Sequence, residues 1–318
     1  MVAYQKPYLT TAQQIDRLQS RGMGISDIEK AERYLSHIGY YRLSAYWFPC
    51  RKTHESGRKR KDQFNSSTQF SDVVDLYVFD KRLRLLLLDA IERVEISVRT
   101  TVALTVGLID PWSYLDPTIY RPRFVRRRGA PPVSDFDKWK DRLSSQLGIS
   151  KEDFVAHFSQ EYPDSELPIW IAVELWDLGM LSKLLSGLDH QHIKKISTTY
   201  AIQRPDVFVA WIRTLNVARN VCAHHARLWN RRNMFEVKRV PEIELPSLFH
   251  LTRPELDRQK PYATLAIMQH FLKQISPDSS WCKKLIALVD TFPETAHFHI
   301  RDAGFPEDWA SLPLWSDA

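Results

Sequence analysis

A single long segment with helical periodicity, residues 71–106, constrains the fold more than any other feature of the sequence. Its apolar residues recur at the three- and four-residue spacing that forms one face of a helix. They are Val74, Tyr77, Val78, Leu85, Leu88, Ile91, Val94, Ile96 and Val98. Charged residues run between them: Lys81, Arg82, Arg84, Glu92, Arg93, Glu95 and Arg99. The pattern predicts the longest helix of the chain.

Helix start signals recur along the rest of the chain. Pro168 and Pro205 each open an apolar run, and a proline in the first helical turn costs no hydrogen bond. They predict helices from Pro168 to about Leu185 and from Pro205 to about Cys222. Ser26 and Glu29 match a capping box at the start of another helix. Further helices are expected at about 11–20, 135–147, 188–202, 261–275 and 279–290.

The composition agrees with a helical protein. The 318 residues include only 10 glycines, which is about 3% where roughly 7% is usual. This scarcity disfavours turn-rich β sandwiches and glycine-looped nucleotide folds. With 44% apolar residues the chain can bury a sizeable core, so global disorder is excluded. No segment alternates with period two for long, and we therefore predict an all-α fold.

Two basic loops interrupt the predicted helices. The first, 51–69, contains Arg58, Lys59, Arg60 and Lys61, and the second, 120–132, contains Arg121, Arg123, Arg126, Arg127 and Arg128. Charge runs of this kind commonly form a solvated loop. A net charge of +6 concentrated into two patches also creates the positive field that nucleic acid seeks. Both interpretations stay open. In the second, RNA is held by Arg58, Lys59, Arg60, Arg126, Arg127 and Arg128.

Cysteine and histidine spacing indicates neither a disulfide framework nor a metal site. Cys50, Cys222 and Cys282 form no C-x-x-C pair, which fits a reducing cytosol. The pairs at 190 and 192 and at 297 and 299 are histidines without a carboxylate or cysteine at zinc-like spacing. The N-terminus shows no signal pattern, and no run approaches the roughly 18 apolar residues of a membrane span. We expect a soluble cytoplasmic protein that needs no metal or cofactor.

The densest polar stretch, 216–232, closes the helix that Pro205 opens and contains Arg219, Asn220, His224 and His225. One interpretation is a helix end whose side chains cap the last carbonyls. The other is RNA cleavage without a metal. Histidine transfers the proton at the ribose 2′-OH or the leaving 5′-oxygen, and arginine stabilises charge on the phosphorus oxygens. Arg219 and His224 diverge by about 140° around a regular helix. Near a helix end they can still converge on one groove, particularly a groove shared with another helix.

The neighbours of this pair also have two interpretations each. Asn220 binds a phosphate or the ribose, or it caps a backbone group. His225 assists the proton transfer, or it packs and caps. Trp229 stacks on a base, or it lies in the core. Phosphates flanking the cleft are the expected ligands of Arg227, Asn230 and Arg231.

Three glutamates, Glu92, Glu95 and Glu174, lie in otherwise apolar predicted helices. A buried charge needs a partner. We expect one or more of them to pair with an arginine such as Arg219 and to hold that side chain in position. A metal site at Glu92 and Glu95 is disfavoured because no histidine stands at ligand spacing.

Several blocks resemble known families. Arg219-Asn220-x-x-x-His224 resembles the Arg-x(4 to 6)-His motif of the HEPN (higher eukaryotes and prokaryotes nucleotide-binding) ribonucleases. Residues 221–231 are similar to the Abi-like abortive-infection family of bacteria, and so are residues 83–95, 167–176 and 304–309. The blocks occur in order, and the resemblance spans about residues 11–315. They indicate the family strongly and any one substrate much more weakly.

The resemblance implies a HEPN-like helical bundle with additional N- and C-terminal helices. It divides the chain into an N-terminal region with a basic loop (1–70), a core that carries the motif (71–240) and a C-terminal extension (241–318). It implies a toxin-like endoribonuclease in phage defence. Arg219 and His224, with Asn220 and His225, form its composite site between two protomers, because the chain holds a single motif.

Regulation by an antitoxin protein or a partner RNA follows from the same resemblance, since some relatives are held in check in these ways. The sequence leaves open an alternative function without catalysis. In that case the same cleft and basic loops bind RNA or a protein partner and no RNA is cut.

Overall fold

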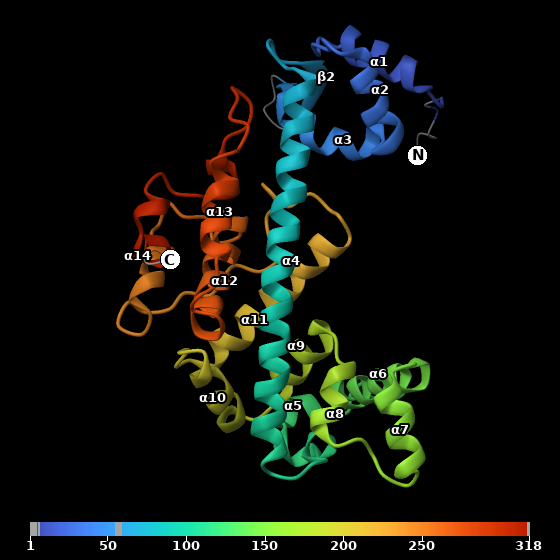
Figure 1. Cartoon of the computed structure of the whole chain (residues 1–318), viewed down its shortest axis with the longest axis vertical. Helices are drawn as coiled ribbons and strands as arrows, with labels where there is room; N and C mark the ends of the chain where they lie inside the picture. The colour runs from blue at the N-terminus through green and yellow to red at the C-terminus, as the bar shows by residue number, and fades with distance from the viewer. Residues whose placement is uncertain (1–4, 6, 55–58, 317–318) are drawn as a thin grey trace.

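The structure is a computed structural model that describes residue 5 and residues 7–54 and 59–316. Its central element is α4 (Phe70–Gly107), a single helix of 38 residues that runs through the molecule (Figure 1). At 1.5 Å per residue α4 is about 57 Å long. Several of the other helices pack directly against it, and the fold is mostly all-α, as predicted. No helix among the described residues combines the length and apolar character that crossing a bilayer needs.

The N-terminal end of α4 carries α1 (Thr11–Ser20), α2 (Ile28–His37) and α3 (Tyr40–Trp47) (Figure 1). Asp27 caps α2, because its carboxylate accepts a hydrogen bond from the backbone N–H of Lys30 at 2.8 Å. The predicted capping box at Ser26 and Glu29 is therefore wrong by one position. After the short 3₁₀ helix η1 (Phe48–Cys50), part of the first basic loop forms an antiparallel hairpin of β1 (Arg51–Thr53) and β2 (Arg60–Phe64).

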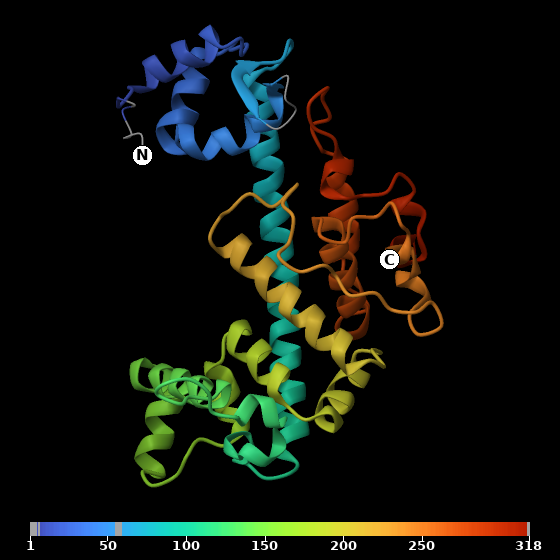
Figure 2. The ribbon, with the colours of Figure 1, turned by 180° about the vertical axis from the view of Figure 1, so that it is seen from behind.

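Four helices pack along the middle of α4. They are α10 (His190–Thr199), α11 (Pro205–Ala223), α12 (Pro261–Ile275) and α13 (Trp281–Val289). In Figure 2, α11 crosses in front of α4 from the side of α10 toward the loop that follows residue 223. This crossing brings the end of the motif helix beside the middle of α4. The predicted helices at 188–202, 205–222, 261–275 and 279–290 are all present, with ends that differ by a few residues.

A second group of helices lies at the C-terminal end of α4: α5 (Pro122–Val125), α6 (Asp135–Ile149), α7 (Asp153–Glu161), α8 (Ile169–Ala172) and α9 (Leu178–Gly187). Two short 3₁₀ helices, η2 (Ser113–Leu115) and η3 (Pro117–Ile119), connect it to α4. The single helix predicted from Pro168 to Leu185 is wrong. The chain turns after the 3₁₀ helix η4 (Val173–Leu175), and the Asp177 carboxylate caps α9 by accepting from the N–H of Met180 at 2.8 Å. A strong cap inside an apolar run starts a new helix.

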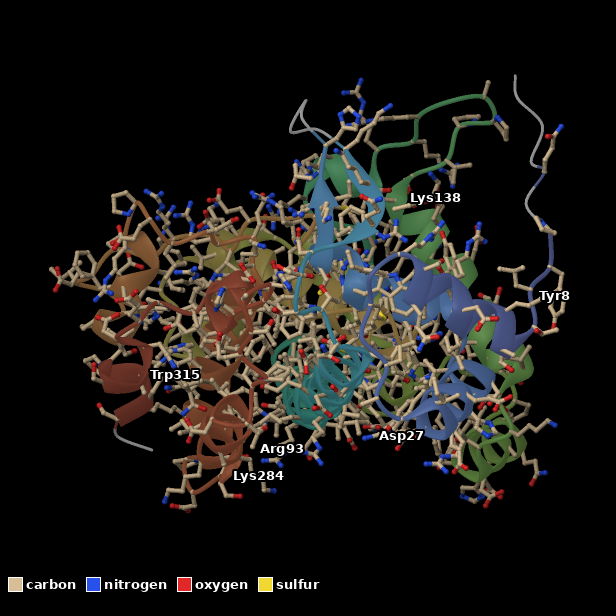
Figure 3. The ribbon with its side chains drawn as sticks, turned by 90° about the horizontal axis from the view of Figure 1, so that it is seen from above. Tyr8, Asp27, Arg93, Lys138, Lys284 and Trp315 are labelled. Carbon is tan, nitrogen blue, oxygen red and sulfur yellow. The ribbon has the colours of Figure 1, made fainter. Side chains whose placement is uncertain are left out.

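The C-terminal segment lies against α12 and forms η5 (Pro246–Thr252), η6 (Ile300–Ala303), η7 (Trp309–Ser311) and α14 (Pro313–Ser316). Seen along α4, the side chains of Lys284 and Trp315 lie on the opposite side from Tyr8 and Asp27 (Figure 3). One connected cluster of buried apolar residues extends from Ile15 to Trp315. The division into 1–70, 71–240 and 241–318 stays a prediction.

Candidate active site

The motif helix α11 has one buried face and one accessible face. Trp211, Leu215, Ala218 and Cys222 are buried against the core. The opposite face carries a polar stripe at four-residue spacing, Asn216, Asn220 and His224, of which Asn220 and His224 are exposed. The sequence prediction that chemistry-bearing residues stand at the end of an apolar helix is consistent with this arrangement.

Arg219 lies on a different side of α11, toward α4. It is half-buried and lines a hollow of about 380 Å³ together with Leu88, Glu92, Glu95 and Arg99 of α4. Its Nη1 donates a hydrogen bond to Oδ1 of Asn220 at 3.3 Å. Among the described residues, no hydrogen bond joins Arg219 to His224. The divergence that helix geometry predicts for this pair is therefore present within one protomer.

The three glutamates differ in exposure and in their partners. Glu95 is half-buried and pairs with Arg99 one turn along the same helix. Glu92 lines the Arg219 hollow but is exposed, and Glu174 is exposed in η4. Glu92 and Glu174 face solvent, so neither is a buried charge that requires a partner. That one of the three glutamates holds Arg219 in position stays a prediction. Among the described residues no ion pair joins Arg219 to a carboxylate.

The backbone reverses directly after α11, and both histidines stand on this turn. His224 caps the helix, and His225 adopts a left-handed conformation with a φ of 54°. The N–H of His225 bonds to the carbonyl of Cys222 at 2.9 Å, and the N–H of Ala226 bonds to that of Val221 at 3.0 Å. These two bonds form a Schellman motif, whose left-handed position is usually glycine. A histidine there exposes an imidazole at a cost of about 1–2 kcal/mol of backbone strain.

Two substitutions at His225 should show how much backbone strain the left-handed conformation stores. His225→Val should lower the free energy of unfolding by about 1–2 kcal/mol, because a β-branched residue resists the left-handed region. His225→Gly should leave that free energy within about 1 kcal/mol, since glycine adopts the conformation freely. Urea denaturation of both variants gives the comparison. Equal stabilities would show that the turn is not strained at this residue.

A buried carboxylate on α4, Asp80, fixes the chain that follows the turn. It is 0% exposed and accepts hydrogen bonds from the backbone N–H of Trp229 at 2.7 Å and from that of Leu228 at 3.1 Å. It also accepts from the Tyr46 hydroxyl at 2.7 Å and pairs with buried Arg84. Burial raises the pKa of the Asp80 carboxyl, and these four donors act against that rise. Asp80 and its partners, here called the Asp80 anchor, join α3, α4 and the segment after the motif in one hydrogen-bond network.

Two more arginines tie the turn to α3. Arg42 Nη1 donates to the carbonyl of His225 at 2.6 Å, and Arg227 Nη1 donates to the carbonyl of Ala45. Burial lowers the pKa of Arg227, which is half-buried. This hydrogen bond directs part of the Arg227 guanidinium toward the protein, and the binding of a flanking phosphate by Arg227 stays a prediction. Its observed contact holds the turn in place.

The residues that follow differ in accessibility. Trp229 is 0% exposed and packs against Phe292 and Phe298, so it belongs to the core and is not available to stack on a base. Asn230 is half-buried, and its carbonyl accepts from Lys260 Nζ at 3.3 Å. Arg231 is exposed. Of the three predicted phosphate ligands in this segment, Arg231 is the one that faces solvent fully.

The two basic loops lie at opposite ends of α4 (Figure 1). Lys59 and Arg60 belong to the hairpin end, where Arg60 Nη1 donates to the carbonyl of Arg51 at 2.7 Å, and Arg58 lies outside the described residues. The exposed residues Arg126, Arg127 and Arg128 follow α5 at the other end, and Arg127 pairs with Asp137 at 3.0 Å. Within one protomer the two loops do not meet at one site.

In each histidine pair noted in the sequence, at 190 and 192 and at 297 and 299, one histidine has a structural environment. His299 Nδ1 lies 2.8 Å from Glu294 Oε2, and His192 is buried at the start of α10. In the part of the chain that the structure describes, no three His, Cys, Asp or Glu side chains gather as metal ligands do.

Asp80 is the residue that sequence analysis missed. It stands on the buried face of α4 in register with Leu76, Leu83 and Leu87, and a carboxylate in an apolar stripe is the signal that could have revealed it. Its backbone partners lie about 150 residues later in the chain, so the sequence did not show them.

Comparison with known proteins supports the resemblance of the motif segments. The sequence model of the Abi-like protein family matches residues 33–230. This range runs from α2 through α4 and α11 to the end of the segment that Asp80 anchors. Searches of the curated proteins and of the solved structures found no match. The chain belongs to the Abi-like protein family.

Proposed function

We propose that the chain is a metal-independent endoribonuclease of abortive infection, with His224 as the proton-transferring group and Arg219 as the group that stabilises transition-state charge. Family membership supports an abortive-infection-related role. The observation that carries the finer proposal is the exposed His224 at the end of α11, on a turn that Arg42 and Asp80 hold firmly. A histidine placed in this way is accessible to a bound strand.

The reaction needs only these groups and the RNA itself. One imidazole takes the proton of a ribose 2′-OH, whose oxygen then attacks the adjacent phosphorus. The bond from phosphorus to the 5′-oxygen breaks, and this oxygen receives a proton from a second imidazole in its protonated form. The products are a 2′,3′-cyclic phosphate and a 5′-OH. Arg219 donates hydrogen bonds to the non-bridging oxygens, where negative charge builds up.

A homodimer supplies the second imidazole and brings the diverging groups together. Beside the Arg219 hollow, α4 exposes large apolar side chains, with Leu85 57% and Ile96 54% exposed. Apolar residues gathered on a surface commonly mark a protein–protein contact. Two protomers that pair over this face of α4 place two copies of α11 near one another, and each contributes an arginine and a histidine.

Disrupting this face should separate the protomers. Ile96→Asp puts a charge into the proposed contact, so dimer affinity should fall by at least tenfold, and cleavage should fall with it. Ile243→Asp is the matched control, since Ile243 is 92% exposed in a different part of the chain. Sedimentation equilibrium measures the affinity. A wild-type protein that stays monomeric at micromolar concentration would rule out the composite site.

Cleavage in the presence of a chelator tests the proposed activity. Purified protein should cut RNA in excess EDTA and leave ends that carry a cyclic phosphate. The alternative, a module that binds RNA or a partner without cutting, is favoured by the separation of Arg219 from His224 within the protomer. In that case affinity falls steeply with salt and no product accumulates.

A further inference from the structure

A second hollow, lined by cationic side chains, lies between α5, α9 and α11. Its volume is about 540 Å³, larger than that of the Arg219 hollow. Gly187 of α9 lets α5 approach closely, because a Cβ at this position would lie 2.4 Å from the ring of Phe124. The N–H of Arg121 bonds to the carbonyl of Gly187 at 2.8 Å and fixes this contact. The α5 segment therefore presents Arg121 and Arg123 to the hollow.

The charge of the hollow is positive and largely uncompensated. Four cations, Arg121, Arg123, Lys183 and Arg213, line it together with one carboxylate, Asp206. Asp206 is engaged by Lys238 and by Arg204, and these contacts lower its pKa although partial burial acts the other way. Lys183 has a carboxylate partner outside this set, Asp135, at 3.1 Å. Within the described residues, none of the three arginines forms an ion pair with a carboxylate.

The side chain of Arg213 is held in a geometry suited to an oxyanion. Its guanidinium carbon lies 3.6 Å from the centre of the Phe235 ring, so one face of the group is stacked on the aromatic. A stacked guanidinium keeps its in-plane N–H groups available for two parallel bonds to phosphate oxygens. Neutral donors lie beside it, namely the hydroxyl of Ser182 and the amide of Asn216. Together they suit a phosphate with one or two negative charges.

The hollow continues into the polar stripe of the motif helix. Arg213 and Asn216 line the hollow, and Asn220 and His224 follow on the same face of α11. At 1.5 Å per residue, Arg213 and His224 are about 16 Å apart along the helix axis. A single bound phosphate does not span that distance, whereas a strand with regularly spaced phosphates does.

We propose that this hollow binds a backbone phosphate of a single-stranded RNA whose path follows α11 to His224. The inference rests on the proposed function and extends it by naming the residues that hold the strand away from the cut: Arg121, Arg123, Lys183 and Arg213. Arg121 and Arg123 belong to the second basic loop, 120–132, but none of the four is among the loop residues predicted to hold RNA: Arg58, Lys59, Arg60, Arg126, Arg127 and Arg128. The hollow fixes the register of the strand, so that one phosphodiester lies at His224.

RNA binding by a protein that cannot cut its ligand tests the proposal. In a His224→Ala background, the double variant Arg123→Ala, Arg213→Ala is compared with Arg33→Ala, Arg301→Ala, which removes two exposed arginines elsewhere. A fluorescent single-stranded RNA is titrated at several salt concentrations. The hollow variant should bind at least tenfold more weakly than the control. Its slope of log affinity against log salt should be smaller by about 1.4, since each lost phosphate contact on a single strand accounts for about 0.7.

A further variant and a mononucleotide probe distinguish the possible reasons for weaker RNA binding. The single variant Arg123→Glu checks that weaker binding does not come from misfolding, because it changes one exposed residue. It should also lower the affinity for RNA. AMP serves as a mononucleotide probe and should displace RNA only weakly. Binding of AMP without binding of RNA would overturn the proposal. A His224→Ala parent that binds no RNA would contradict the proposed function and this inference together. A parent that binds RNA while the hollow variant equals the control would contradict this inference alone.

Discussion

His224→Ala should reduce the rate of RNA cleavage by about 10²–10⁴-fold, the range typical for loss of a proton-transferring group. Arg219→Ala should cost about 10²–10³-fold, because one stabilising donor for the transition-state charge is lost. Single-turnover cleavage of a labelled RNA measures both rates. The free energy of unfolding should change little, since His224 is exposed and Arg219 forms one long hydrogen bond within the described part of the chain, to Asn220.

His190→Ala is the matched control for the histidine. It is exposed in the first turn of α10 and takes no part in the motif. Its cleavage rate should equal that of the wild type. A His224→Ala protein that keeps full activity would assign the proton transfer to another group, and His225→Gly, which preserves the turn, would then be the next variant to measure.

Asp80→Ala should lower the free energy of unfolding by about 3–5 kcal/mol. The substitution leaves the buried Arg84 guanidinium without its carboxylate. Removing one partner of a buried ion pair destabilises a protein by an amount of this size. It also leaves the backbone N–H groups of Leu228 and Trp229 unsatisfied. Urea denaturation measures the loss.

Asp75→Ala provides the comparison for this effect. Asp75 lies on the exposed side of the same helix, and its loss should change the free energy of unfolding by no more than about 0.5 kcal/mol. Cleavage by Asp80→Ala, measured at a temperature where the protein is folded, should also be impaired, because the segment after His225 loses the hydrogen bonds that hold Leu228 and Trp229 to α4. Equal stabilities of the two variants would show that the anchor contributes little.

Much of the fold could be predicted because local signals agree with the tertiary structure. The apolar stripe of α4 and the prolines at the start of α11 and α12 mark helices directly. The break before Asp177 could not be predicted in this way, since the apolar pattern of 168–185 continues through it. The β1–β2 hairpin was missed because its strands are short and mostly polar.

The candidate site was predictable in its residues but not in its arrangement. The end of α11 follows from Pro205 and from the polar stretch after Asn216. The anchoring of the turn depends on Asp80, Tyr46 and Arg42, which contact it from distant parts of the sequence. The orientation of Arg227 depends on the same packing. Helix geometry alone gives the divergence of Arg219 and His224, but the elements that surround each of them are set by tertiary contacts.

The most direct test of the central claim is to map the ends of a cleaved RNA and then replace the ribose at the cut by 2′-deoxyribose. The account predicts that the wild-type protein leaves a 2′,3′-cyclic phosphate and a 5′-OH in EDTA, and that the deoxy substitution blocks the cut. It also predicts that the double variant Arg219→Ala, His224→Ala leaves the RNA intact and no longer arrests growth. A double variant that cuts RNA and arrests growth as the wild type does would contradict it.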